Sequence, residues 1–310
     1  MLKKIKNKLL GKNSKEVNID LKKFSFNDPD RISNLKEFQQ NYNYSILPVD
    51  IYEPVPDLRD IDITDISEDD KILDLNIKYD FSFIKENLDR ILNEKIIPDW
   101  LQENPMFPVL DLAAYCSIIE NYKPERIIEV GAGYSTCLST MFTDIINLKT
   151  IITAIEPYPR EHLLKLEKEN KITLIQNKIQ DIDLSVTNLI RSLKENDILF
   201  IDTTHIVNRD SDVSYLFIKL LPMLQKGVVV QIHDIFLPYD YSRSVYYGRG
   251  TFYNEQYLLA SILANSNSYT SLYSSYKTFL EHFNKTKIDS NSWTKPDKMR
   301  SGGSFWMQKN

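Results

Sequence analysis

Five short apolar runs rich in β-branched residues recur between residues 126 and 234, with helical or polar segments between them. The runs are RIIEV (126–130), TIITAIE (150–156), ITLIQ (172–176), DILFID (197–202) and GVVVQIHD (227–234). Nearly continuous apolar strands that alternate with helices are typical of a parallel sheet covered on both faces. The chain is therefore predicted to be an α/β protein, and the segments 269–276 and 304–310 are candidates for its last strands.

The 310 residues allow two domains, or one large α/β domain with an extension. Residues 1–75 are polar and interrupted by prolines, which indicates an irregular region with short helices, and residues 80–104 follow as a helical segment. We therefore predict an N-terminal extension over 1–104, in the position of a cap, and a main domain over 105–310. Within that domain the spacer 277–303 is expected to be a partly ordered loop.

Charge and cysteine content exclude several classes of protein. The net charge of -5 provides no positive field for a polyanion, so we expect no nucleic acid partner. Two cysteines without a Cys/His cluster indicate neither a disulfide framework nor a zinc site, which suits a cytoplasmic protein. The basic segment 1–15 is either a solvated tail or an amphipathic helix in weak peripheral contact with a membrane. Homo-oligomerisation is left open.

The segment EVGAGYST (129–136) directly follows the first predicted strand and predicts a cofactor turn. Gly131 and Gly133 allow the backbone to turn sharply and to approach a ligand closely, and Glu129 can accept a hydrogen bond from an ammonium group. Glu156 ends the second strand, where a carboxylate can bind ribose hydroxyls. A dinucleotide site would require a third glycine where Thr136 stands, so these residues favour S-adenosylmethionine (SAM) over NAD.

Longer motifs make a family resemblance specific. FIDTTH (200–205), SDVSYLFIKLLPMLQKG (211–227), QIHDIFLPYDY (231–241) and NEQYLL (254–259) stand in order after EVGAGYST and IEPYP (155–159). Over about residues 104–310 the chain resembles class I SAM-dependent methyltransferases, and in particular a bacterial methyltransferase-domain family that is similar to sugar O-methyltransferases. The resemblance implies a Rossmann-like sheet of seven strands whose last strand is antiparallel, with helices on both faces.

The resemblance also implies roles for individual residues. The methionine end of SAM would be bound by Glu129, Gly131, Gly133, Ser135 and Thr136. Glu156 would bind the ribose, Asp181 would lie near the adenine, and Asp202 would face the sulfonium centre.

Polar residues gather where the fourth and fifth strands end: Asp202 with His205, and His233 with Asp234. Methyl transfer to an alcohol requires removal of its proton, either by a general base or by a bound metal ion. His205 is the first candidate for the base and His233 the second. The resemblance implies a Mg²⁺ or Mn²⁺ site at Asp202, His233 and Asp234, although imidazole is a poor ligand for Mg²⁺.

The resemblance to sugar O-methyltransferases implies O-methylation of a saccharide or nucleotide-sugar hydroxyl, in surface-glycan or natural-product biosynthesis. A segment with Tyr246, Tyr247 and Arg249 beside Gly248 and Gly250 is either a flap over the acceptor or a surface loop. Glu255 either reaches the acceptor or begins a helix. The alternatives left open are an amine or other small-molecule acceptor, a non-catalytic SAM- or nucleotide-binding scaffold, and a dehydrogenase.

Overall fold

The computed structural model describes residues 33–34, 37, 71–241, 252–283 and 301–310. The chain divides into two compact units, Met1–Glu68 with Ser242–Tyr253, and Asp69–Tyr241 with Asn254–Asn310. The sheet and its helices belong to the second unit. The basic segment 1–15 and the flap residues 246–250 lie outside the described residues, so their predicted roles stay predictions.

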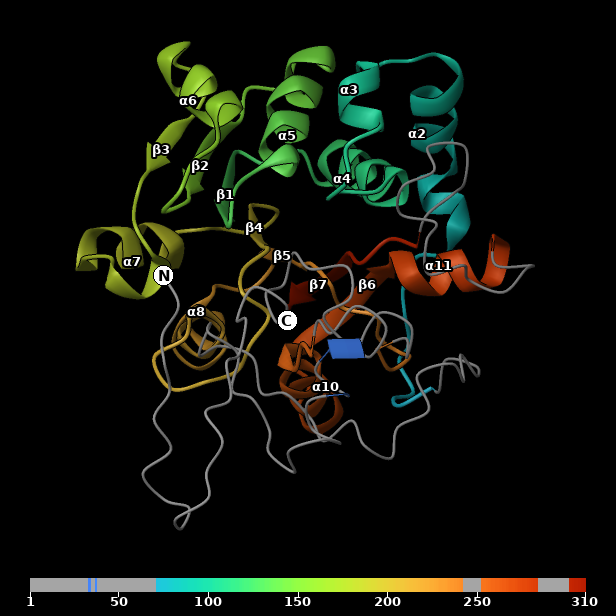
Figure 1. Cartoon of the computed structure of the whole chain (residues 1–310), viewed down its shortest axis with the longest axis vertical. Helices are drawn as coiled ribbons and strands as arrows, with labels where there is room; N and C mark the ends of the chain where they lie inside the picture. Colours follow the sequence, from blue (N-terminus) through green and yellow to red (C-terminus); the bar gives the residue numbers. More distant parts are fainter. Residues whose placement is uncertain (1–32, 35–36, 38–70, 242–251, 284–300) are drawn as a thin grey trace, which may run out of the picture. The chain divides into compact units, whose positions relative to one another are not determined.

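The second unit contains a seven-stranded sheet in the order β3-β2-β1-β4-β5-β7-β6 (Figure 1). Its strands are β1 (Arg126–Val130), β2 (Ile151–Ile155), β3 (Thr173–Ile175), β4 (Ile198–Ile201), β5 (Val229–Ile232), β6 (Tyr269–Ser274) and β7 (Phe305–Lys309). The first five strands pair in parallel, whereas β7 pairs antiparallel with both β5 and β6. The predicted Rossmann-like sheet with an antiparallel last strand is therefore confirmed.

Helices cover both faces of this sheet (Figure 1). They are α2 (Phe81–Asn93), α3 (Asp99–Gln102), α4 (Val109–Tyr122), α5 (Tyr134–Ile145), α6 (Glu161–Lys168), α7 (Leu184–Arg191), α8 (Asp212–Tyr215), α10 (Glu255–Asn265) and α11 (Ser275–His282). A short turn η2 (Ile179–Asp181) follows β3, and α8 continues into the π-helical turn η3 (Leu216–Leu220) and the turn η4 (Leu221–Met223). No helix within these described ranges is long and apolar enough to span a membrane.

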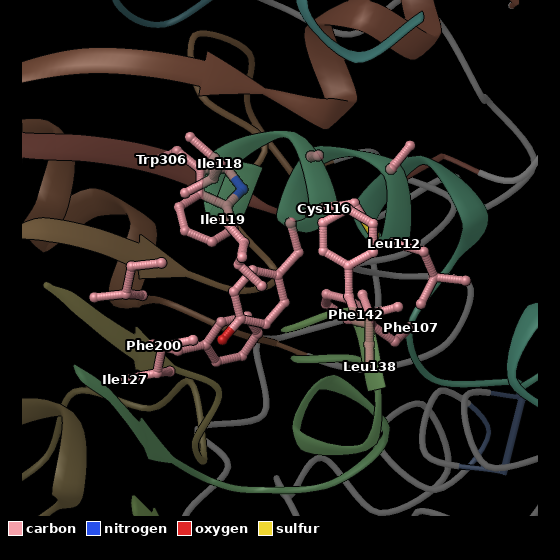
Figure 2. Packing of buried hydrophobic residues seen from close by; sticks show 14 of the residues in the cluster. Phe107, Leu112, Cys116, Ile118, Ile119, Ile127, Leu138, Phe142, Phe200 and Trp306 are labelled. Carbon is pink, nitrogen blue, oxygen red and sulfur yellow. The ribbon is translucent and has the colours of Figure 1, made fainter. Parts of the chain in front are cut away.

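Alternate residues of each central strand enter different cores, which explains the continuous apolar runs. Ile127 and Phe200 pack with α2, α4 and α5, while Ile128 and Leu199 pack with the helices of the opposite face. Figure 2 shows the first core, and in it the ring centroid of Phe200 lies 5.9 Å from that of Phe107 and 6.2 Å from that of Trp306. Both faces of the sheet are therefore buried, as expected for parallel strands.

The N-terminal helices differ from the expected pattern. The predicted helical segment 80–104 is two helices, because the chain is extended at Pro98 before α3 begins. Ile84, Leu88 and Ile91 on α2 are buried in the core that includes α4. These helices therefore pack in the core of the sheet, although they fall within the predicted extension 1–104. Residues 275–282, expected to end a strand and begin a loop, form α11 instead.

Candidate functional site

A cavity of about 400 Å³ opens at the carboxyl ends of β1, β2 and β4, where open α/β sheets bind their ligands. The residues that line it come from the segment before α4, the turn after β1, the segment after β2 and the end of β4: Met106, Phe107, Gly131, Ala132, Gly133, Tyr134, Ser135, Glu156, Tyr158, Arg160 and Asp202. The predicted residues Gly131, Gly133, Ser135, Glu156 and Asp202 are thus brought together.

Gly131 makes the turn that closes this cavity. Its φ of +83° lies in the left-handed region, and an added Cβ would stand 1.5 Å from the carbonyl oxygen of Asp202. The amide of Gly131 donates to Ile155, and the amide of Asp202 donates to Val130. The ends of β1, β2 and β4 are therefore held together at a distance that only glycine permits.

Glu129 is not among the residues that line the cavity, and its predicted contact with an ammonium group stays a prediction. Its side chain is 0% exposed and accepts hydrogen bonds from four hydroxyl groups at 2.7–2.9 Å, donated by Tyr115, Ser135, Thr136 and Ser139. Burial raises the pKa of Glu129, and the hydroxyl donors oppose that effect. Because the carboxylate is enclosed by α4 and α5, its role in this structure is to join β1 to these helices.

Thr136 is likewise buried and does not line the cavity. Its hydroxyl accepts from the amide of Gly133 at 3.1 Å while donating to Glu129, so it caps the start of α5. Ser135 reaches the cavity, although its hydroxyl also donates to Glu129. The Thr136 hydroxyl therefore supports the turn, and its predicted contact with the methionine end stays a prediction.

The two acids predicted after β2 and β3 lie in different surroundings. Glu156 lines the cavity, and its carboxylate accepts from the amide of Tyr158 at 2.8 Å. Burial raises the pKa of Glu156. Asp181 is exposed in η2 and is not among the residues that line the cavity. Its predicted contact with an adenine stays a prediction.

Asp202 lines the cavity, and His205 is buried in contact with it. Nε2 of His205 lies 3.3 Å from Oδ1 of Asp202 and 3.4 Å from Oδ2 of Asp234, and Nδ1 contacts the carboxylate of Glu255. Burial opposes ionisation of Asp202, but the nearby charge of His233 and the hydrogen bond to His205 lower its pKa overall. The candidate base thus lies against an ionised carboxylate that lines the cavity.

His233 is held by a second buried carboxylate. Its Nε2 donates to Asp111 at 3.2 Å, and its Nδ1 lies 3.4 Å from Asp234 and 3.7 Å from Asp202. Burial alone would lower the pKa of His233, but these three carboxylates raise it to about 10. The ring is therefore an imidazolium at neutral pH, which argues against the expectation that it acts as a base.

A divalent ion does not fit this arrangement. The predicted set of Asp202, His233 and Asp234 includes an imidazole, which is a poor ligand for Mg²⁺ and whose Nε2 is already bonded to Asp111. Within the part of the chain that the structure describes, no group of three or more His, Cys, Asp or Glu side chains is arranged to hold a metal ion. The two carboxylates instead lie against the protonated ring of His233.

Sequence reasoning did not identify Asp111 or the Gly302–Gly303 pair. Asp111 is fully buried and accepts from the amides of Gly303 and Ser304, both at 3.0 Å. An added Cβ on Gly302 would stand 2.4 Å from Asp111, so the entry to β7 passes close to the site. The one sequence signal was the glycine pair itself, in a chain that has only eight glycines.

Part of this chain is similar in sequence to known proteins. Residues 128–235 match a protein family described as a methyltransferase domain. An uncharacterized protein of Archaeoglobus fulgidus is 34% identical over 99 residues, which cover 31% of this chain and 43% of that protein. The chain thus spans less than half the length of this relative. The family match supports the predicted methyltransferase domain and SAM as its cofactor.

Solved structures of low sequence identity are also similar. An SAH-bound methyltransferase of Podospora anserina is 16% identical, covers 77% of this chain and all of its own, and has a TM-score of 0.42. A putative caffeoyl-CoA O-methyltransferase of Staphylococcus aureus is 18% identical over 72% of this chain and 91% of its own, with a TM-score of 0.39.

Proposed function

We propose that this chain is a SAM-dependent methyltransferase that methylates a hydroxyl group of a saccharide or nucleotide-activated sugar. The observation that carries the proposal is the Asp202–His205 pair at the edge of a glycine-lined cavity. Asp202 lines this ligand-sized space at the carboxyl ends of the strands, and its Oδ1 lies 3.3 Å from Nε2 of His205, which supports a role for His205 as the proton acceptor.

The residues of the cavity fit the cofactor. An added Cβ on Gly133 would meet nothing within 4 Å, so this backbone faces open space that a ligand can approach closely. Gly131, Gly133 and Ser135 would bind the methionine end, Glu156 the ribose and Asp202 the cationic centre. An ionised Asp202 suits the positive charge of a sulfonium.

The chemistry required of the chain is transfer of a proton. When bound, SAM supplies an electrophilic methyl group and leaves as S-adenosylhomocysteine (SAH), while the acceptor oxygen gives up its proton as it forms the new bond. In the proposal, Nε2 of His205 accepts that proton, with Asp202 beside it. His233 cannot do so at neutral pH because both of its ring nitrogens are protonated.

Aromatic side chains near the cavity support an acceptor with a flat or C–H-rich face. Tyr158 lines the cavity and is 77% exposed, while Trp100 is 51% exposed and lies 6.5 Å from Tyr134, centroid to centroid. Amphipathic rings of this kind combine a broad apolar face with a polar group. A sugar ring or a nucleoside base can stack on such faces, which is why we favour an activated sugar over a small amine.

Calorimetric titration and a methyl-transfer screen test this proposal. SAH is expected to bind and NAD is not; binding of NAD without SAH would overturn the cofactor assignment. The screen offers nucleotide-sugars and amines in parallel, each with and without EDTA. Transfer to a hydroxyl that survives EDTA supports the proposal, whereas transfer only to amines contradicts it.

The His205→Gln variant separates an enzyme from a binding module. It is expected to bind SAH as the wild type does and to lose most of its turnover, since removal of a general base costs about 10²–10⁴-fold. Full activity in this variant would remove His205 from the mechanism.

A further inference from the structure

We propose that Arg160, which lines the cavity just before α6, binds a phosphate group of the acceptor and so selects a nucleotide-activated sugar over a free saccharide. The inference rests on the proposed function and deepens it by naming a group that the acceptor must carry. Among the residues that line the cavity in the described part of the chain, Arg160 is the only one with a basic side chain.

The charge of Arg160 is not used by the fold. Among the described residues, no carboxylate forms an ion pair with its side chain. Glu156, which also lines the cavity, instead accepts from the amide of Tyr158 at 2.8 Å. The side chain of Arg160 makes no capping hydrogen bond at the start of α6. Because the residue is exposed as well, its guanidinium is available to a ligand.

An aromatic ring restrains this guanidinium at the wall of the cavity. Cζ of Arg160 lies 5.9 Å from the ring centroid of Tyr134, which lines the cavity as the first residue of α5. The ring of Tyr134 also stacks on His162, with centroids 5.4 Å apart. Burial lowers the pKa of His162, and the charge of Arg160 lowers it further. This imidazole is therefore neutral at neutral pH, and Arg160 carries the positive charge of the group.

A guanidinium among exposed apolar side chains suits a nucleotide. Its paired N–H groups match the oxygens of a phosphate, and aromatic faces can stack on a base. Tyr158 and Met106 line the cavity and are 77% and 57% exposed, and Trp100, 51% exposed, lies 6.5 Å from Tyr134 between ring centroids. Exposed apolar side chains that gather at one opening are typical of a binding site.

The methionine carboxylate of SAM is the other anion that Arg160 could bind. The turn after β1 already offers a place for that carboxylate, because α5 has 12 residues and begins at Tyr134 in the wall of the cavity. The N-terminus of a helix attracts an anion, and Gly133 leaves open space beside it. Arg160 comes from the separate segment after β2, so we assign it to the acceptor.

Calorimetric titrations of the full-length protein saturated with SAH test this inference. The probes are UDP, GDP and dTDP, each compared with its own nucleoside, while SAH occupies the cofactor site. At least one diphosphate is expected to bind more tightly than its nucleoside by about tenfold or more, the scale of hydrogen bonds to a charged group. Arg160→Gln is expected to abolish this difference and to leave SAH and nucleoside affinities unchanged. Arg160→Lys is expected to keep part of it, because a lysine retains the charge without the paired donors.

Arg191→Gln is the matched control. Arg191 is also an exposed arginine, at the end of α7, and it does not line the cavity. The substitution removes the same charge from the protein but is expected to leave the affinity for the diphosphate unchanged. Equal losses in the Arg160→Gln and Arg191→Gln variants would overturn the inference, because only the overall charge would then matter.

Three other results would overturn it as well. The first is that no diphosphate binds more tightly than its nucleoside, and the second is that Arg160→Gln retains the difference. The third is a loss of SAH affinity in Arg160→Gln with diphosphate binding unchanged, because the arginine would then bind the methionine carboxylate. Failure of the proposed function is distinguishable, since the wild type would then not bind SAH or not transfer a methyl group. The comparison of diphosphate with nucleoside can be made without SAH in that case.

Discussion

Replacing Gly131 with alanine is expected to destabilise the protein by about 2–5 kcal/mol. A left-handed φ costs an L-residue about 1–2 kcal/mol, and overpacking costs about 1–3 kcal/mol more. The clash is severe, because the new Cβ would lie 1.5 Å from the carbonyl oxygen of Asp202. Ordinary contact requires about 3.5 Å, so the end of β4 must move by about 2 Å.

Gly133→Ala is the matched control, two residues away in the same turn. Gly133 has a φ of -170°, outside the left-handed region, and its added Cβ meets nothing within 4 Å. The free energy of unfolding of the Gly133→Ala variant is expected to stay within about 1 kcal/mol of the wild-type value. Urea unfolding measures the stability of both variants. SAH titration measures whether the cofactor site is intact, and only Gly131→Ala is expected to weaken SAH binding, because only that substitution displaces Asp202.

Equal stability of Gly131→Ala and wild type would refute the reasoning, because neither the strained φ nor the close approach would then constrain the turn. A comparable loss in Gly133→Ala would also refute it, since the damage would follow from removing any glycine of the motif.

Three further predictions concern the buried charges. Glu129→Leu is expected to cost about 1–3 kcal/mol in urea unfolding, because four buried hydroxyls lose their acceptor; an unchanged midpoint would contradict the role assigned to this carboxylate. Asp111→Asn is expected to cost about 3–5 kcal/mol, since it removes one partner of a buried ion pair with His233, and thermal unfolding at neutral pH measures the loss. The folded-state pKa of His233 is raised to about 10, so its stabilising effect is complete below its unfolded pKa of 6.5 and declines as pH rises through 10. Unfolding free energies measured across this range should therefore fall with pH in the wild type and more weakly in His233→Gln; parallel curves would show that His233 does not titrate as described.

The sheet was predictable because burial on both faces selects long apolar runs. The predicted segment 126–130 coincides with β1, and the segment 197–202 includes β4 with one residue to spare at each end. The break at Pro98 was in principle visible as well, since proline disfavours helix in the residue before it. α11 was missed because its residues continue the polar and aromatic composition of β6.

The site was harder to predict because a sequence does not distinguish a buried acid from one that binds a ligand. Glu129 precedes the glycine turn, as a ligand acid would, and only the position of four hydroxyls shows that it is enclosed. The partner of His233 lies 122 residues earlier in the chain, at Asp111. No local spacing signals a contact of that range.

The approach of Gly303 and Ser304 to Asp111 also bears on the order in which the protein folds. These contacts close loops of 192 and 193 residues, and β7 lies between β5 and β6 in the sheet. Because β6 pairs with β7 among the described strands, it gains its place in the sheet only when β7 arrives. The anchoring of His233 by Asp111 is completed at the same moment, so ligand binding should appear late and in a single step during refolding. The time at which SAH binding appears during refolding would then report when β7 enters the sheet.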